Sequence, residues 1–230
     1  MSLDPEVLAL GGLWYVAFLL SLTCHEASHA LAAYLGGDDT ATSAGQVTLN
    51  PLPHIRREPL GTVAVPLLTF VLNNWMLGWA SAPYSALWEH RYPHRAGLMA
   101  LAGPAANFLL ALVAAILINI GIATGVFAVP SSITFFNVVE ASGDLAPLAQ
   151  FLSILFTQNV LLMTFNLLPV PPLDGNTAIG LLMPEAAARR WFDLTRDQAF
   201  GILGLVLAWY FFGDLFWPIL RIAIRLLYWT

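Results

Sequence analysis

Residues 7–35 read VLALGGLWYVAFLLSLTCHEASHALAAYL, an apolar run long enough to cross a membrane as a helix. Its second half contains the pattern H-E-x-x-H, formed by His25, Glu26 and His29. On a helix, residues at i and i+4 share one face, so the two imidazoles can bind the same metal ion. Glu26 projects from a neighbouring face, where it can act as a general base. The run therefore predicts a membrane helix that carries a metal site.

The apolar setting strengthens this interpretation. Charged and titratable side chains are costly within lipid, so they indicate a functional site by default. The alternative is a pair of hydrogen-bonded histidines and a surface glutamate. It fits poorly, because an unpaired Glu26 in this run would have nothing to offset its desolvation. Cys24 points about 100° away from His25 around the helix and is interpreted as a packing residue.

The composition of the whole chain is that of a membrane protein. Its 230 residues are 58% apolar and only 10% charged, whereas soluble domains are about a quarter charged. The net charge is −5, and no basic stripe suggests a nucleic-acid partner. A single cysteine excludes an internal disulfide. These features predict a polytopic integral membrane protein in contact with lipid.

Further apolar runs follow the first one, separated by polar or proline-rich stretches. They cover residues 61–80, 96–129, 148–168 and 199–229. The fold class expected is all-α, with about four to six transmembrane or re-entrant segments and a small β element near the cytoplasmic face. We expect one membrane-embedded domain over residues 1–230, with its core at about 7–183 and a C-terminal membrane region at 184–230.

Two of these runs leave alternatives open. The run at 61–80 contains Pro66, Asn73 and Asn74, so it either spans the membrane or dips in and returns. The last run is either one long helix or two pieces broken at Gly213-Asp214. A short amphipathic piece is expected from Asp174 to about Met183.

Arginine placement indicates the orientation, because arginine-rich loops favour the cytoplasm. The arginines outside the last run are Arg56, Arg57, Arg91, Arg95, Arg189, Arg190 and Arg196, whereas the loop at 130–147 has none. If the run at 61–80 crossed fully, its two flanking arginine loops would face opposite sides, so a re-entrant run fits better. The metal motif then lies towards the cytoplasmic side of a bacterial or archaeal cell membrane.

A catalytic zinc site needs a third protein ligand and one open position. Asp174 is the favoured candidate, because it follows the prolines of NLLPVPPLDG at 166–175 and falls at a similar depth to the histidines. The alternative is that Asp174 caps the following short helix, and spacing alone does not separate the two. His54, His90 and His94 are interpreted as loop or membrane-interface histidines.

Five motifs in order carry a family resemblance. They are HEASHA at 25–30, TLNPLPHI at 48–55, GWA at 78–80, ALAGPAAN at 100–107 and NLLPVPPLDG at 166–175. In order and spacing they resemble the site-2 protease family of intramembrane zinc metalloproteases, in a compact form without a PDZ or CBS domain. The resemblance implies one Zn²⁺ per chain held by His25, His29 and Asp174. It also implies that Glu26 is the catalytic base.

The same resemblance implies contacts with a transmembrane protein substrate. A β-prone stretch containing Val47, Thr48 and Leu49 is expected beside the site, where its edge would pair with the unwound substrate. Asn166 is implied to help hold the substrate backbone, and Asn107 is expected at most to support a ligand. Relatives often read H-I-D-P where this chain has HIRREP at 54–59, which leaves local substrate contacts open. The oligomeric state is not predicted.

Two other functions are alternatives to proteolysis. A membrane zinc-binding protein or transporter that does no hydrolysis would need the same ligands but would not use Glu26 as a base. A transporter should also carry polar groups along a path, yet Glu26 is the only acid in the first four apolar runs. An inactive relative kept as a binding partner is disfavoured by the intact H-E-x-x-H and L-D-G motifs.

Overall fold

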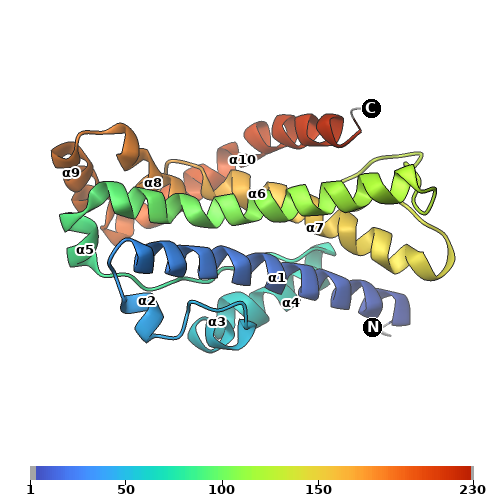
Figure 1. Ribbon diagram of the computed structural model, residues 1–230, viewed down its shortest axis with the longest axis horizontal. Helices are drawn as coiled ribbons and strands as arrows, with labels where there is room; N and C mark the ends of the chain where they lie inside the picture. The colour runs from blue at the N-terminus through green and yellow to red at the C-terminus, as the bar shows by residue number, and fades with distance from the viewer. Residues whose placement is uncertain (1–3, 229–230) are drawn as a thin grey trace.

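The computed structural model describes residues 4–228, and all regular elements within that range are helices. Four helices are long and apolar enough to cross a membrane, namely α1 (Pro5–Leu35), α6 (Pro93–Ala123), α7 (Ala146–Asn166) and α10 (Gln198–Leu227). Consecutive spans run in opposite directions, so both ends of the chain lie at one end of the molecule (Figure 1). The expected all-α membrane fold is therefore confirmed.

The shorter elements connect these spans. They are α2 (Thr40–Ser43), α3 (Pro51–Arg57), the π-helical turn η1 (Leu60–Ala64), α4 (Val65–Asn73), α5 (Ala86–Arg91), the 3-10 turn η2 (Gly143–Leu145), α8 (Asp174–Ala178), the 3-10 turn η3 (Ile179–Leu182) and α9 (Glu185–Thr195). The helices α2, α5 and α9 gather at the end of the molecule opposite the two termini (Figure 1).

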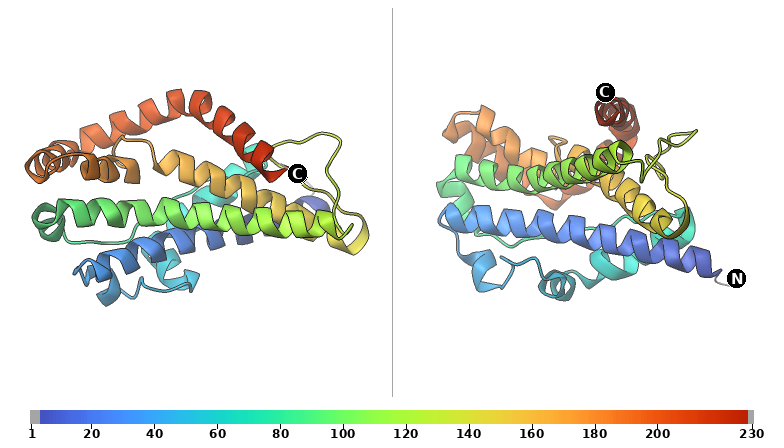
Figure 2. Two further views of the ribbon diagram at one scale, coloured as in Figure 1. Left: turned by 45° about the horizontal axis from the view of Figure 1, so that its top comes forward. Right: turned by 45° about the vertical axis from the view of Figure 1, so that its right-hand side comes forward.

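The core lies among α1, α6 and α7, which pack against one another along much of their length. Its largest fully buried apolar side chains are Trp14, Phe18, Ile118 and Ile154. The helix α10 packs mainly on α7 and exposes most of its apolar surface. It continues through Gly213-Asp214, so the alternative of two separate pieces is wrong. Its axis is bent (Figure 2), as expected for a helix that contains Pro218.

The second apolar run folds back on itself and does not form one long helix. It forms η1 and α4, and the chain reverses at Asn74, whose φ of 59° is left-handed. Two hydrogen bonds tie the returning segment to the entering one, from Leu77 N to Thr69 Oγ1 (3.0 Å) and from Trp79 N to the Gly61 carbonyl (3.1 Å). The run is therefore a hairpin, and its re-entrance into the membrane, which the arginine distribution favours, stays a prediction.

The expected β element near residues 46–49 is not present, since the structure assigns no strand anywhere between residues 4 and 228. This stretch forms bends between α2 and α3. Its amides bond locally, from Gln46 N to the Ala41 carbonyl (2.9 Å) and from Thr48 N to the Gln46 carbonyl (2.9 Å). Asn50 then caps α3 through its side chain. The prediction failed because turn and cap hydrogen bonds use backbone groups that a strand would offer to a partner.

Candidate metal centre

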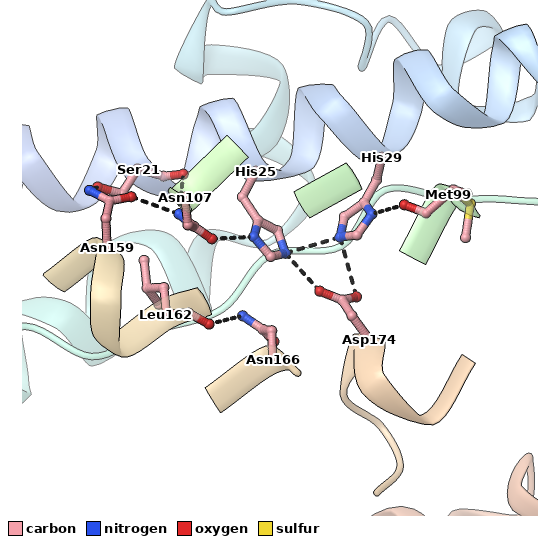
Figure 3. Close-up of polar contacts among 9 residues, drawn as sticks. All are labelled: Ser21, His25, His29, Met99, Asn107, Asn159, Leu162, Asn166 and Asp174. Carbon is pink, nitrogen blue, oxygen red and sulfur yellow. Dashed lines mark hydrogen bonds and ion pairs between the residues drawn. The ribbon is translucent and has the colours of Figure 1, made fainter. Parts of the chain in front are cut away.

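The three side chains predicted to bind metal lie together, two from α1 and one from α8 (Figure 3). His25 Nε2 and His29 Nε2 are 3.0 Å apart. Asp174 Oδ2 lies 3.1 Å from His25 Nε2, and Asp174 Oδ1 lies 3.2 Å from His29 Nε2. Ligand atoms in a tetrahedral zinc site are about 3.3 Å apart, given zinc–ligand distances of about 2.0–2.1 Å. The two His–Asp174 distances go to different carboxylate oxygens, and one ligand atom from each of the three residues lies within 4.8 Å of the others, close enough to share one zinc ion.

Each histidine uses its other ring nitrogen in a hydrogen bond that turns Nε2 towards Asp174. His25 Nδ1 lies 2.6 Å from Asn107 Oδ1, and His29 Nδ1 lies 2.8 Å from the Met99 carbonyl oxygen. Carbonyl oxygens only accept, so each Nδ1 carries a proton, and in the neutral imidazole each Nε2 then presents its lone pair to a metal. Metal-binding histidines are generally held in this way.

Space for a metal ion is provided by Gly103 of α6. A Cβ added there would lie 2.3 Å from His29 Nε2 and 2.5 Å from His25 Nε2, so any side chain would occupy the centre of the site. Asp174 Oδ2 is buried and accepts no hydrogen bond from the residues between 4 and 228. Room beside the imidazoles, a buried carboxylate oxygen that faces them and a two-nitrogen, one-oxygen donor set fit zinc.

Asp174 reaches the histidines because α8 begins directly against the end of α7. Asp174 is the first residue of α8, and its carboxylate points to the imidazoles instead of capping the helix. Gly175 permits the close approach, since an added Cβ would lie 2.3 Å from the Leu168 carbonyl oxygen. Burial alone would raise the pKa of the Asp174 carboxyl, but in the metal-free site His29 and His25, when protonated, outweigh it and hold that pKa well below its usual range.

Glu26 is buried in the bundle, with 4% of its surface exposed. It follows His25 on α1, so its backbone is held by the same helix that positions the two imidazoles. The alternative of a surface glutamate is therefore wrong. Burial beside a cluster of imidazoles is the environment in which a carboxylate can exchange protons with a reactant.

The remaining predicted residues lie at varying distance from the three ligand residues. Asn107 contacts His25 directly, and Asn166 at the end of α7 donates its amide to the Leu162 carbonyl (3.1 Å) without contacting a ligand (Figure 3). The stretch 47–49 lies in the loop before α3, where Leu49 is 70% exposed. The other histidines, His54, His90 and His94, contact the Thr48 carbonyl, Asp193 and the Met183 carbonyl.

Sequence reasoning missed four contributions to this site, those of Gly103, Ser21, Asn159 and the Met99 carbonyl. Only one of them left a usable signal. Asn159 precedes the motif residue Asn166 by seven positions within an apolar run. That spacing puts both side chains on one side of a helix, and an intramembrane amide is itself unusual. The roles of Gly103 and the Met99 carbonyl depend on how α6 packs on α1.

The chain matches the family model described as "Peptidase family M50" over residues 13–210. It is similar to "Putative zinc metalloprotease YwhC" of Bacillus subtilis, with 34% identity over 209 residues that cover 90% of this chain and 84% of YwhC. It also resembles "Putative zinc metalloprotease Rip2" of Mycolicibacterium smegmatis, with 29% identity over 180 residues. That match covers 76% of this chain and 61% of the relative, so the chain spans about three fifths of Rip2.

The protein of the same name from Mycobacterium tuberculosis (strain Erdman) is 28% identical over 209 residues, which cover 87% of this chain and 70% of the relative. No solved structure is significantly similar to the chain.

Proposed function

This chain belongs to peptidase family M50, the site-2 protease family of intramembrane zinc metalloproteases, and on that basis we propose that it hydrolyses a peptide bond in or near a transmembrane segment of another membrane protein. One observation carries the proposal. His25, His29 and Asp174 are grouped closely enough to hold one metal ion, and Glu26, which follows His25 on α1, is buried in the same bundle.

We propose that the three ligands hold one zinc ion per chain and leave a fourth position open to reactants. When bound, zinc supplies a Lewis acid that activates water and polarises the scissile carbonyl. Glu26 takes the proton from the attacking water and delivers it to the leaving amine. Asn107 and the Met99 carbonyl keep both imidazoles oriented throughout. Gly103 keeps the space between them free.

A substrate helix hides its carbonyls in internal hydrogen bonds, so it must unwind before hydrolysis. Asn166 stands at the end of α7, and its amide can exchange the Leu162 carbonyl for a carbonyl of the unwound substrate. Val47, Thr48 and Leu49 offer partly exposed side chains on the loop before α3. We propose side-chain contact there in place of strand pairing, because the stretch forms bends and both backbone groups of Thr48 already have local partners.

We propose that the catalytic end of the bundle faces the cytoplasm of a bacterial cell. The elements at the α5 and α9 end carry Arg91, Arg189 and Arg190, whereas the loop between α6 and α7 carries Glu140 and Asp144 without arginine. Asp174 follows α7 at this arginine-rich end. The proposed domain is single, with α10 of the C-terminal region packed on α7 of the core.

The test compares purified wild type with Glu26→Gln in liposomes, by zinc content and by cleavage of transmembrane peptides. We expect Glu26→Gln to keep zinc and to cleave at least about a hundredfold more slowly, the usual contribution of a general base. Glu6→Gln is the matched control, because Glu6 lies exposed at the start of the same helix.

Three results would contradict the proposal in different ways. Cleavage by Glu26→Gln at the wild-type rate would exclude Glu26 as the base. Failure of metal-loaded wild type to hold zinc would exclude the three ligands. Zinc binding without cleavage of any peptide would favour a non-hydrolytic zinc-binding or transport protein.

A further inference from the structure

Behind His25, on the side away from Asp174, buried polar side chains connect α1, α6 and α7 (Figure 3). Asn107 Nδ2 donates to Asn159 Oδ1 (2.8 Å), and Asn159 Nδ2 donates to Ser21 Oγ (2.8 Å). Ser21, Asn107 and Asn159 are each 0% exposed. Because these side chains are buried away from solvent, every donor and acceptor in such a group needs a partner.

Backbone carbonyls set the direction of these bonds, because they can only accept. The Leu155 carbonyl lies 2.8 Å from Asn159 Nδ2, so the amino side of the Asn159 amide must face it. Ser21 gives its one hydroxyl proton to the Ala17 carbonyl (2.7 Å), so its oxygen accepts from Asn159 as well. Both contacts hold Asn159 with Oδ1 towards Asn107.

This orientation determines that of Asn107. Its Nδ2 faces Asn159 Oδ1, and its other contact, the Ser21 carbonyl at 3.4 Å, is long and weak. Its Oδ1 therefore faces His25 Nδ1 and accepts that proton. A flipped Asn107 amide would offer an N–H to His25 instead. His25 would then carry its proton on Nε2, the atom that faces Asp174, and could not bind a metal through it.

We propose that Asn159 is a positioning residue for the metal site, which acts through Asn107 to keep the His25 proton on Nδ1. The inference rests on the proposed function in that His25 is taken as a zinc ligand. Asn159 itself contacts neither histidine nor Asp174. The relay runs from two backbone carbonyls through the side chains of Asn159 and Asn107 to the imidazole.

Asn159→Leu tests the relay, because leucine is similar in size but neither donates nor accepts. Thr157→Val is the matched control, since Thr157 is also fully buried on α7 and its hydroxyl bonds only its own helix. Zinc affinity is measured by chelator competition, and the His25 tautomer by ¹⁵N NMR of histidine-labelled, metal-free protein. We expect Asn159→Leu to bind zinc about tenfold more weakly. Metal-free His25 should shift towards the Nε2–H tautomer, with Thr157→Val unchanged.

A rescue separates orientation from packing. Asn107→Asp places a carboxylate beside His25, and a carboxylate accepts through either oxygen, so it needs no partner to orient it. In the Asn159→Leu background, Asn107→Asp should restore most of the lost zinc affinity. If affinity falls in Asn159→Leu but is not restored, Asn159 acts through packing and the relay is wrong. Unchanged affinity and tautomer in Asn159→Leu would also overturn it.

The wild-type protein provides a test that no folding defect can obscure. If metal-free wild type carries the His25 proton on Nε2, the relay is wrong whatever the variants do. If the proton is on Nδ1 but the protein binds no zinc, the proposed function fails while the relay stands. The two failures are therefore distinguishable.

Discussion

His25 and His29 lie one turn apart on α1 and face the same carboxylate, yet their surroundings differ. His29 Nδ1 lies 2.8 Å from the Met99 carbonyl, an oxygen that α6 holds in place and that cannot become a donor. His25 Nδ1 lies 2.6 Å from a side-chain amide, which can flip and needs its own partners. One ligand is thus oriented by a single backbone contact, and the other by the packing of α1, α6 and α7.

The largest loss of zinc binding is expected from a substitution that affects both histidines equally. Gly103→Ala would put a Cβ 2.3 Å from His29 Nε2 and 2.5 Å from His25 Nε2, so it should abolish zinc binding through both ligands at once. The zinc content of the purified variant after metal loading measures this loss. Gly12→Ala is the control, because an added Cβ there meets nothing within 4 Å. Wild-type zinc affinity in Gly103→Ala would mean that the ion does not lie between the two imidazoles.

An intermediate loss of zinc affinity is expected when the support of one histidine is removed, and it should differ between the two histidines. Asn107→Ala removes the acceptor of the His25 proton and should weaken zinc binding by about 10- to 100-fold, as loss of such partners typically does. Met99→Leu keeps the backbone carbonyl that serves His29 and conserves volume, so zinc affinity should change little. Chelator competition on both variants gives the ratio of their zinc affinities. Equal losses in the two variants would remove the distinction between side-chain and backbone support.

The smallest loss of zinc affinity is expected at Ser21, whose hydroxyl contacts Asn159 and reaches His25 only through Asn159 and Asn107. Ser21→Ala removes one of the two acceptors of the Asn159 amide but leaves the Leu155 carbonyl. The loss should be within about 1 kcal/mol, the typical value of one hydrogen bond, and so at most about fivefold in zinc affinity. Ser28→Ala on the same helix is the control. A loss as large as that of Asn107→Ala would show that Ser21 alone determines the orientation.

Sequence patterns located the candidate site well where one helix or one short motif sufficed. The i, i+4 spacing of His25 and His29 put both imidazoles on one face, and the proline-rich stretch before Asp174 allowed its carboxylate to return to them. Loop charge favoured a second run that does not cross the membrane, and the chain reverses there at Asn74. The stretch 46–49 was misjudged, because β-propensity says nothing about whether a partner strand exists. Its amides bond to α2 and its own turn instead.

The membrane spans and the chemical identity of the ligands follow from local composition and spacing, because lipid requires continuous apolar helices and zinc requires particular donor atoms. The orientation of those donors does not follow from local pattern. It depends on Gly103 and the Met99 carbonyl of α6 meeting α1, and on Asn159 of α7 meeting both. These groups acquire their roles only when helices far apart in sequence pack together. They are a glycine without a side chain, a backbone oxygen and a buried amide.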